Sequence, residues 1–305
     1  MEREQAEKKY VINKFIDNRP PARACFAYGS GVFYQGKSSY GRTLIDLIFV
    51  VDNIESFLIE NIKENPKDFA KLGFLPPNNT NIVIPSSKTI YLINIKENNR
   101  YFKYGLIEYN NFLEAFESLN SMFLPGRFSK PVMKIKSDVD IDKAIDNNLF
   151  NYFLLGLLTL PNKYRYYNNL CEHITTLSYL NDPRNGIVEN FNKSAVLFYS
   201  NHDAILEMYK SYTSDFLTIN QDNIMNIDFN KLTSSVNLLP STILDLLDKK
   251  GIDKEDLYLL RKELLKFHKA MNRRDSYEQI LSTFIINGPV RSSAYIGNKL
   301  LKRIY

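Results

Sequence analysis

The first 135 residues alternate short runs of β-branched and aromatic residues with turn-forming residues, which is typical of strands. Strands are predicted near residues 23–28, 44–51, 88–95, 100–107 and 131–136. Three further segments have the apolar spacing of amphipathic helices, namely Glu2 to Asp17, Ile54 to Leu72 and Tyr109 to Asn120. This half of the chain is therefore predicted to be a sheet with helices packed around it.

From Asp138 onward the pattern changes to helices. Helical periodicity covers about 138–160, 164–181, 193–213, 240–249, 253–270 and 275–286. The breaks fall at Pro161, at residues 182–186 and in the polar stretch 214–238. The chain is thus predicted to be α+β, with a sheet domain at 1–136, a helical domain at 137–238 and a C-terminal helical region at 239–305.

Composition places the chain in the globular class. Its 305 residues are 44% hydrophobic and 24% charged, which is enough to form a core. The longest apolar run, Leu149 to Leu160, is about half the length needed to cross a bilayer and predicts a buried helix. The charged N-terminal segment is not typical of a cleavable signal peptide or transit peptide, so none is expected. Cys25 and Cys171 lie far apart, so neither a disulfide framework nor a zinc site is expected.

Charge is mild overall and concentrated at one end. A formal net charge of +5 is low for a protein dedicated to duplex binding, so no nucleic-acid partner is expected. Residues 287–305 contain no acid, and Ile296, Leu300 and Ile304 recur at four-residue spacing. A basic amphipathic helix of this kind can lie on an anionic membrane surface. A helix docked on the core explains the periodicity equally well. The cations that would contact lipid are Arg291, Lys299, Lys302 and Arg303.

A small-residue bend follows the first predicted strand. Gly29, Ser30 and Gly31 would let backbone N–H groups and a hydroxyl approach a triphosphate. Asp46, on the next predicted strand, could hold Mg²⁺ against those phosphates. This layout suits nucleotidyl transfer, although a structural turn explains Gly-Ser-Gly equally well on spacing alone.

A second glycine pattern, residues 31–38, fits the P-loop expression, and Asp52 follows an apolar run. A working P-loop opens directly into a helix, yet residues 39–43 are turn formers followed by a strand-like run. Only 14 residues separate Lys37 from Asp52, too few for a crossover helix and its loops. We reject this interpretation, and the dinucleotide fingerprint also fails because its third glycine position is Tyr34.

Several separated blocks resemble the mitochondrial-type phosphatidate cytidylyltransferases, also called the mitochondrial translocator assembly and maintenance protein family. The blocks follow the family's order and cover most of residues 26–210, with a thinner match in the tail. They are 28–33 with Gln35, 45–49, 103–107, 126–132, 177–179 with Asp182 and Arg184, and 291–299.

The resemblance implies a nucleotidyltransferase-fold domain with a mixed sheet, followed by a helical, winged-helix-like domain. It also implies synthesis of CDP-diacylglycerol from CTP and phosphatidate with Mg²⁺, at a membrane surface. The enzyme would be peripheral, on the cytoplasmic face if bacterial or the matrix side of the mitochondrial inner membrane if a presequence was removed. The implied catalytic residues are Ser30, Asp46 and Asp182, with Asp46 on the metal, and the implied nucleotide-binding residues are Gly29, Ser30, Gly31, Lys103, Arg127, Lys130 and Arg184.

The chain departs from the common pattern at the metal. Nucleotidyltransferases often carry two acids one residue apart, but the position two after Asp46 is Ile48. We expect the second carboxylate to be Asp182, with Glu108 as the next candidate. Asp52 lies about 20 Å further along the strand and is excluded. The family's Trp-His pair and its glycine-rich turn are also missing, and the corresponding positions are 57–58 and 86–89.

Two alternatives stay open on the sequence. One is a nucleotidyltransferase with a different acceptor, such as a tRNA end, a sugar phosphate or a protein. The other is a catalytically inactive fold that serves as a membrane or assembly adaptor, which the missing strand carboxylate keeps in consideration.

Overall fold

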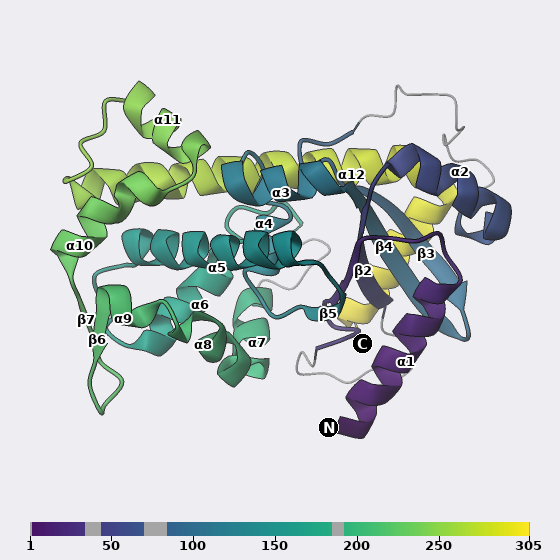
Figure 1. Cartoon of the computed structure of the whole chain (residues 1–305), viewed down its shortest axis with the longest axis horizontal. Helices are drawn as coiled ribbons and strands as arrows, with labels where there is room; N and C mark the ends of the chain where they lie inside the picture. Colours follow the sequence, from purple (N-terminus) through teal and green to yellow (C-terminus); the bar gives the residue numbers. More distant parts are fainter. Residues whose placement is uncertain (1, 34–43, 70–83, 185–191, 305) are drawn as a thin grey trace.

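The computed structural model describes residues 2–33, 44–69, 84–184 and 192–304, and side chains from residue 6 to residue 297 within those ranges. Figure 1 shows a sheet at one end of the molecule and a helical part at the other, joined lengthwise by one long helix.

A mixed sheet of five strands forms the first part. Its order is β3-β4-β2-β1-β5, where β2 and β4 run parallel and every other neighbouring pair is antiparallel. The bounds are β1 Ala24–Tyr28, β2 Leu44–Val51, β3 Ile90–Glu97, β4 Arg100–Glu108 and β5 Met133–Lys136. Both faces of β1 and β2 are largely buried, which is why these strands read as continuous apolar runs. The predicted mixed sheet and its strand positions are confirmed to within about two residues.

Helices cover this sheet. They are α1 (Glu2–Asp17), α2 (Ile54–Glu64), α3 (Tyr109–Ser118) and the short α4 (Pro125–Phe128). The side chain of Asn53 caps α2 by accepting a hydrogen bond from the Ser56 N–H, 2.8 Å away. The predicted helix 54–72 is too long, because α2 ends before Pro66 and gives way to the 3₁₀ turn Pro66–Asp68; residues 70–72 lie outside the described residues.

The second part is mainly helical. The predicted helix 193–213 is two helices that meet at Asn201, and the stretch 214–238 holds a two-stranded hairpin and short helices. A hairpin beside helices is compatible with a winged-helix-like domain, and that finer label stays a prediction. The elements are α5 (Val139–Thr159), α6 (Tyr167–Leu177), α7 (Lys193–Ser200), α8 (His202–Lys210), α9 (Thr213–Phe216), β6 (Leu217–Ile219), β7 (Met225–Ile227), α10 (Phe229–Ser234) and α11 (Ser241–Lys249).

The two helices predicted at 253–270 and 275–286 form one continuous helical segment, which is joined to the tail across a kink to make α12 (Leu257–Ile304). It is helical except at Gly288, where φ is 69° and ψ is 165°, and Pro289 follows. Glycine adopts this positive φ at little cost, and proline suits the first turn of the segment that follows. Figure 1 shows α12 passing from the helical part to the sheet, where the chain then turns.

Side chains of α12 satisfy the edge strand β3, whose ladder with β4 is interrupted between Leu92 and Ile95. The Asn287 amide donates to the Tyr91 carbonyl at 2.7 Å and accepts from the Ile93 N–H at 3.0 Å. An edge strand would otherwise expose these groups as a template for pairing with another chain. Because α12 also packs against α5, this helix contacts both the sheet and the helical part.

Candidate active site

The glycine bend lies against Asp46. Tyr28, the last residue of β1, is paired with Asp46 on β2, and Gly29 follows with φ +78°. The Gly29 carbonyl accepts from the N–H groups of Val32 and Phe33 at 3.1 and 2.9 Å, which closes the bend. A Cβ atom at Gly29 would lie 2.9 Å from Asp46 Oδ2. The two features that the sequence singled out are therefore adjacent in space.

Gly31 has no room for a side chain, because a Cβ atom there would lie 2.3 Å from the Leu44 carbonyl oxygen. We therefore expect Gly31→Ala to destabilise the protein by about 2 kcal/mol, the usual range for overpacking against backbone. Chemical denaturation of both proteins measures this difference. Gly251→Ala is a comparison site where strain comes from φ +61° alone, since a Cβ there meets nothing within 4 Å. Equal stability of Gly31→Ala and the parent would contradict the close packing of the bend.

Lys103 faces the same carboxylate from the neighbouring strand. It is paired with Asp46 in the parallel β2–β4 ladder, and its Nζ lies 3.8 Å from Asp46 Oδ1. The ammonium group also lies 4.2 Å from the centre of the Tyr91 ring, a cation–π distance. Because both charged side chains are mostly buried, with 12% and 19% exposed, their interaction is only weakly screened by solvent.

Arg127, on α4, lies above the start of the bend. Its guanidinium carbon is 4.8 Å from the centre of the Tyr28 ring and 4.4 Å from that of Phe123. Burial alone would lower the arginine pKa, but Tyr28, Tyr91 and Asp46 outweigh it and the pKa is raised. Its Nε is buried and finds no acceptor among the described residues. A buried, unused donor of this kind fits a phosphate oxygen.

Lys130 is a buried cation among other cations. Its ammonium group donates to the Gly126 carbonyl and, at 2.5 Å, to Ser178 Oγ. Burial, and then the charges of Arg127, Lys193 and Arg184, hold the pKa of Lys130 well below its usual value. An anion bound here would favour the charged form, so this cluster suits a phosphate group.

Asp182 and Arg184 bind each other. The Asp182 side chain is 4% exposed and its carboxylate accepts from Arg184 Nε at 2.9 Å and from Nη2 at 2.6 Å. Burial alone would raise the pKa of Asp182, but these hydrogen bonds dominate and lower it. The bonds of Asp182 described here do not reach Asp46, so its assignment as second metal carboxylate stays a prediction.

Glu108 is not placed to complete a metal site with Asp46. It ends β4 and accepts from the Ile54 N–H at 3.1 Å, at the start of α2. Because Lys103 is the β4 residue level with Asp46, Glu108 lies five residues further along, or about 17 Å. The prediction of Glu108 as second candidate was therefore wrong, and its role is to satisfy a helix N-terminus.

Sequence reasoning missed the rings around the site. Tyr28 and Tyr91 are buried, with their hydroxyl oxygens 3.3 Å apart. Tyr295 comes from the segment after Gly288, and its ring centre lies 5.8 Å from Lys103 Nζ. Tyr28 and Tyr295 lie inside blocks of the family resemblance, but with 40 tyrosines and phenylalanines spread over the chain the sequence gives no sign that these rings surround the site.

Because the Tyr295 ring lies within cation–π reach of the Lys103 ammonium group, we expect Tyr295→Leu to raise KM for the nucleotide about threefold to tenfold with little change in kcat. Tyr295→Phe should restore the parent value, since it keeps the ring. Steady-state kinetics at varied nucleotide concentration provide the measurement. Tyr258→Leu, at a 76% exposed site on the same helix, is the matched control. Equal KM values for Tyr295→Leu and the parent would remove Tyr295 from the site.

The predicted lipid-binding cations have different surroundings. Arg291 donates to the carbonyls of Lys67, at 2.9 Å, of Phe69, at 3.2 Å, and of Asp68. It thus ties α12, just after its kink at Gly288, to the turn after α2, and its contact with lipid stays a prediction. The side chains of Lys299, Lys302 and Arg303 lie outside those described.

The arrangement can bind and position a polyphosphate. Mg²⁺ usually takes one or two protein carboxylates plus phosphate oxygens, so Asp46 beside the bend fits the ion with a bound nucleotide. Among the described residues, no group of three or more acids, histidines or cysteines forms a preformed metal cage.

The described helices also include none with the length and apolarity for a membrane crossing.

Comparisons with known proteins identify similar chains. A family model described as "Phosphatidate cytidylyltransferase, mitochondrial" matches residues 9–302. Curated proteins of the same name are similar over much of the chain. The Caenorhabditis elegans protein is 27% identical over 73% of this chain and 72% of its own length. The Dictyostelium discoideum protein is 30% identical over 70% and 55%, and the Schizosaccharomyces pombe protein is 25% identical over 96% and 82%.

Proposed function

Because the chain belongs to the family of mitochondrial phosphatidate cytidylyltransferases, we propose that it transfers the cytidylyl group of CTP to phosphatidate, forming CDP-diacylglycerol and pyrophosphate. This is the activity that the sequence resemblance implies. The observation that carries the proposal is the contact between the glycine bend and Asp46, with Lys103 and Arg127 beside them.

The reaction needs no protein nucleophile. A phosphatidate phosphate oxygen attacks the α-phosphorus of CTP, a new P–O bond forms, and the bond between the α-phosphorus and the bridging oxygen breaks to release pyrophosphate. The attacking phosphate is already anionic at neutral pH. The protein therefore has to position the two reactants and neutralise charge. Backbone N–H groups at Gly29–Gly31, the Ser30 hydroxyl and the cations Lys103 and Arg127 would hold the triphosphate.

Asp46 would hold Mg²⁺, which, when bound, neutralises charge that develops on the departing pyrophosphate. Lys103 lies 3.8 Å from this carboxylate and balances it in the protein alone. The second carboxylate assigned to Asp182 belongs to the same proposal.

The cluster around Lys130 would take a second phosphate group. Lys130 and Arg184 bring two cations to one place, and the centre of the Tyr179 ring lies 4.6 Å from Lys130 Nζ. A compact ammonium group suits this role because it needs no fixed bidentate geometry. A reaction between a nucleotide and a phosphorylated lipid requires such a second place for a phosphate group, and Arg127 lies close enough to act on both.

Pyrophosphate release measured with each of the four nucleoside triphosphates, with and without phosphatidate, tests the proposal. We expect Mg²⁺-dependent release with CTP and phosphatidate together. Release that needs another acceptor would favour a different nucleotidyltransferase, and no release under any condition would favour the inactive adaptor.

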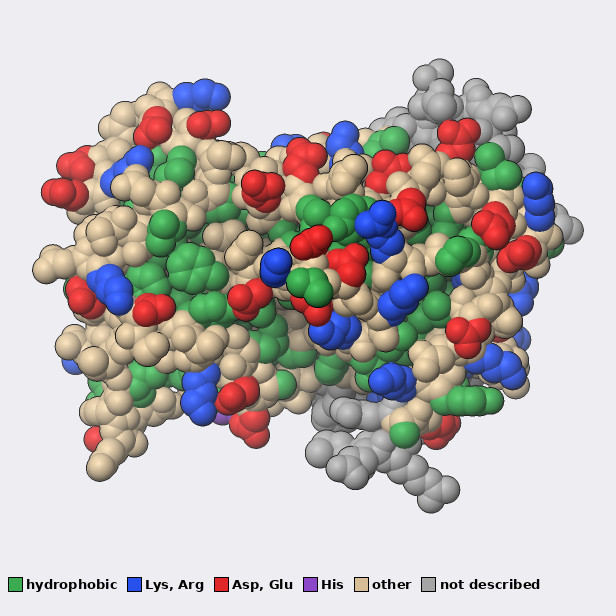
Figure 2. All heavy atoms as spheres, in the orientation of Figure 1, with side chains coloured by type: hydrophobic (Ala, Val, Ile, Leu, Met, Phe, Trp, Pro, Cys, Tyr) green, Lys and Arg blue, Asp and Glu red, His purple; other side chains and the backbone are tan. Residues whose placement is uncertain are grey.

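The face in Figure 2 mixes Lys and Arg with Asp and Glu, which gives no support to a nucleic-acid acceptor on that face.

We also propose peripheral attachment to an anionic membrane, with the basic end of the chain taking part. Deleting residues 298–305 removes Lys299, Lys302 and Arg303 and should weaken binding to anionic liposomes about 100-fold, at roughly 1 kcal/mol for each cation. Flotation with liposomes and calorimetric titration with CTP measure the two affinities. CTP binding should stay within about twofold of the parent. Unchanged liposome binding after truncation would give the tail a packing role only.

A further inference from the structure

One face of α12 carries large exposed side chains in two blocks. At 100° per residue, seven such side chains and the small Ala270 fall within about a third of the helix circumference. No acidic residue occupies that arc between residues 266 and 284. We call these seven residues the docking face: Lys266, Lys269, Arg273, Tyr277, Ile280, Leu281 and Phe284.

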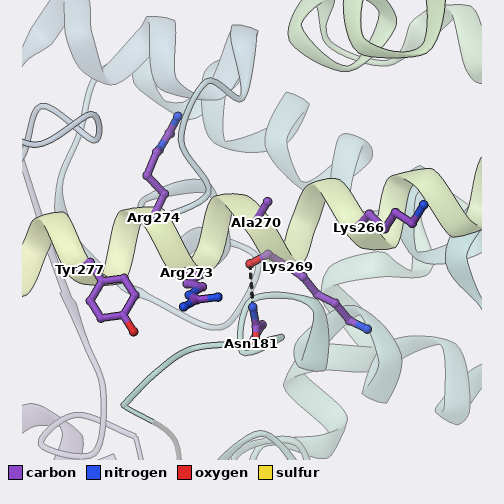
Figure 3. Close-up of a pocket in the computed structure, with 7 residues that line it drawn as sticks. All are labelled: Asn181, Lys266, Lys269, Ala270, Arg273, Arg274 and Tyr277. Carbon is purple, nitrogen blue, oxygen red and sulfur yellow. Dashed lines mark hydrogen bonds between the residues drawn. The ribbon is translucent and has the colours of Figure 1, made fainter. Parts of the chain in front are cut away.

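The first block of the docking face is cationic and lines a recess. The recess has a volume of about 520 Å³ and lies between α12 and Asn181, whose amide donates to the Lys269 carbonyl at 3.4 Å. Figure 3 shows Lys269, Arg273 and Tyr277 on the side of α12 that faces Asn181, whereas Arg274 points away. Within the part of the chain that the structure describes, no carboxylate forms an ion pair with Lys269 or Arg273.

The second block is apolar and exposed. Tyr277, Ile280, Leu281 and Phe284 are 51%, 45%, 53% and 43% exposed. Apolar residues at i, i+3, i+4 and i+7 normally face a core, and here they face outward instead. Two helical turns of exposed apolar side chains can enter the boundary between lipid headgroups and acyl chains, and the cations that precede them on the same face can meet anionic headgroups.

We propose that the docking face binds the surface of an anionic bilayer, with Lys269 and Arg273 at the lipid phosphates and Ile280, Leu281 and Phe284 at the acyl boundary. Charge complementarity selects this occupant, because an apolar protein partner would not require the cationic block. The docking face is distinct from the basic end of the chain. The proposal concerns binding alone and does not depend on the proposed reaction.

The absence of tryptophan from the chain gives a direct test. Phe284→Trp introduces a single reporter into the docking face, and Val139→Trp places one at a 68% exposed site on α5. The probe is vesicles of phosphatidylcholine with phosphatidylglycerol, which contain no phosphatidate, compared with phosphatidylcholine alone. We expect the emission of the Phe284→Trp variant to shift to shorter wavelength only with the anionic vesicles, and that of the Val139→Trp variant to stay constant.

Charge reversal provides the second measurement. The double variant K269E/R273E should lower the affinity for anionic vesicles about 25-fold or more, since each cation near a bilayer contributes roughly fivefold. The control K143E/K210E reverses two cations, each 71% exposed, elsewhere in the helical part, and should keep the parent affinity within about threefold. Flotation of the Phe284→Trp variant without a shift in its emission, or failure of the parent to float with anionic vesicles, would overturn the proposal. Flotation of the parent protein without any pyrophosphate release from CTP and phosphatidate would instead count against the proposed function and leave this proposal standing.

Discussion

Replacing Asp46 by asparagine should reduce the rate of CDP-diacylglycerol formation by about 1,000-fold or more while the protein stays folded. The carboxylate lies against the glycine bend and 3.8 Å from Lys103, where it can meet the phosphates of a nucleotide held by the bend. Asparagine keeps the size of the side chain but loses the charge that would hold Mg²⁺. Steady-state rates measure the loss, and circular dichroism checks the fold.

Asp52→Asn is the matched control for this variant. Asp52 immediately follows the same strand, is 74% exposed and pairs with Arg23 at the surface. We expect its rate to stay within about twofold of the parent, because an exposed ion pair contributes little. Turnover near the parent level in Asp46→Asn would remove Asp46 from the catalytic site, and a loss equal to that in Asp52→Asn would point to a general charge effect.

Lys130→Met should lower kcat/KM about 100-fold without destabilising the protein. Burial and neighbouring cations hold the pKa of Lys130 well below its usual value, so a charged Lys130 lowers the stability of the folded state. Methionine fills a similar volume without that cost, although it leaves the Gly126 carbonyl and Ser178 hydroxyl with one donor fewer. Lys134→Met, at a 57% exposed site on β5, is the control and should retain most of the activity.

The lowered pKa of Lys130 also predicts how the stability of the protein changes with pH. The unfolded chain holds the Lys130 proton up to about pH 10.5, whereas the folded state releases it at lower pH. The unfolded state therefore binds more protons between those two values, so stability rises with pH across that window. Below the lowered pKa the folded protein bears the whole free-energy cost of a charged, buried Lys130. The Tm of Lys130→Met should therefore exceed that of the parent most at low pH, and the difference should shrink as pH rises. A Tm difference that grows with pH would contradict the buried-cation account.

Local sequence pattern predicted much of the sheet and the bend. Strands β1 and β2 are continuous apolar runs bounded by turn residues, and a Gly-Ser-Gly bend directly after β1 brings Asp46 on its neighbour within contact. Adjacent strands place such features together with little further information. Lys103 follows from the same logic, because β4 lies next to β2.

Features that depend on distant contacts were not predictable from the sequence. α12 was predicted as separate helices because residues 271–274 interrupt its apolar spacing. In the structure, Asn287 of α12 binds Ile93 of β3, and Glu278 of α12 binds Ser86, just before β3. These contacts fasten α12 along the edge strand. The position of Tyr295 at Lys103 depends on the turn at Gly288. The role of Glu108 at the start of α2 likewise depends on which element packs beside the end of β4.

The central claim is that the bend at residues 29–31 and Asp46 together hold the metal-bound triphosphate. Calorimetric titration of the parent and of Asp46→Asn with CTP, each with and without Mg²⁺, tests it most directly. The account predicts that Mg²⁺ strengthens CTP binding to the parent and that Asp46→Asn loses this gain while retaining the weaker metal-free binding. The same gain from Mg²⁺ in both proteins would contradict it.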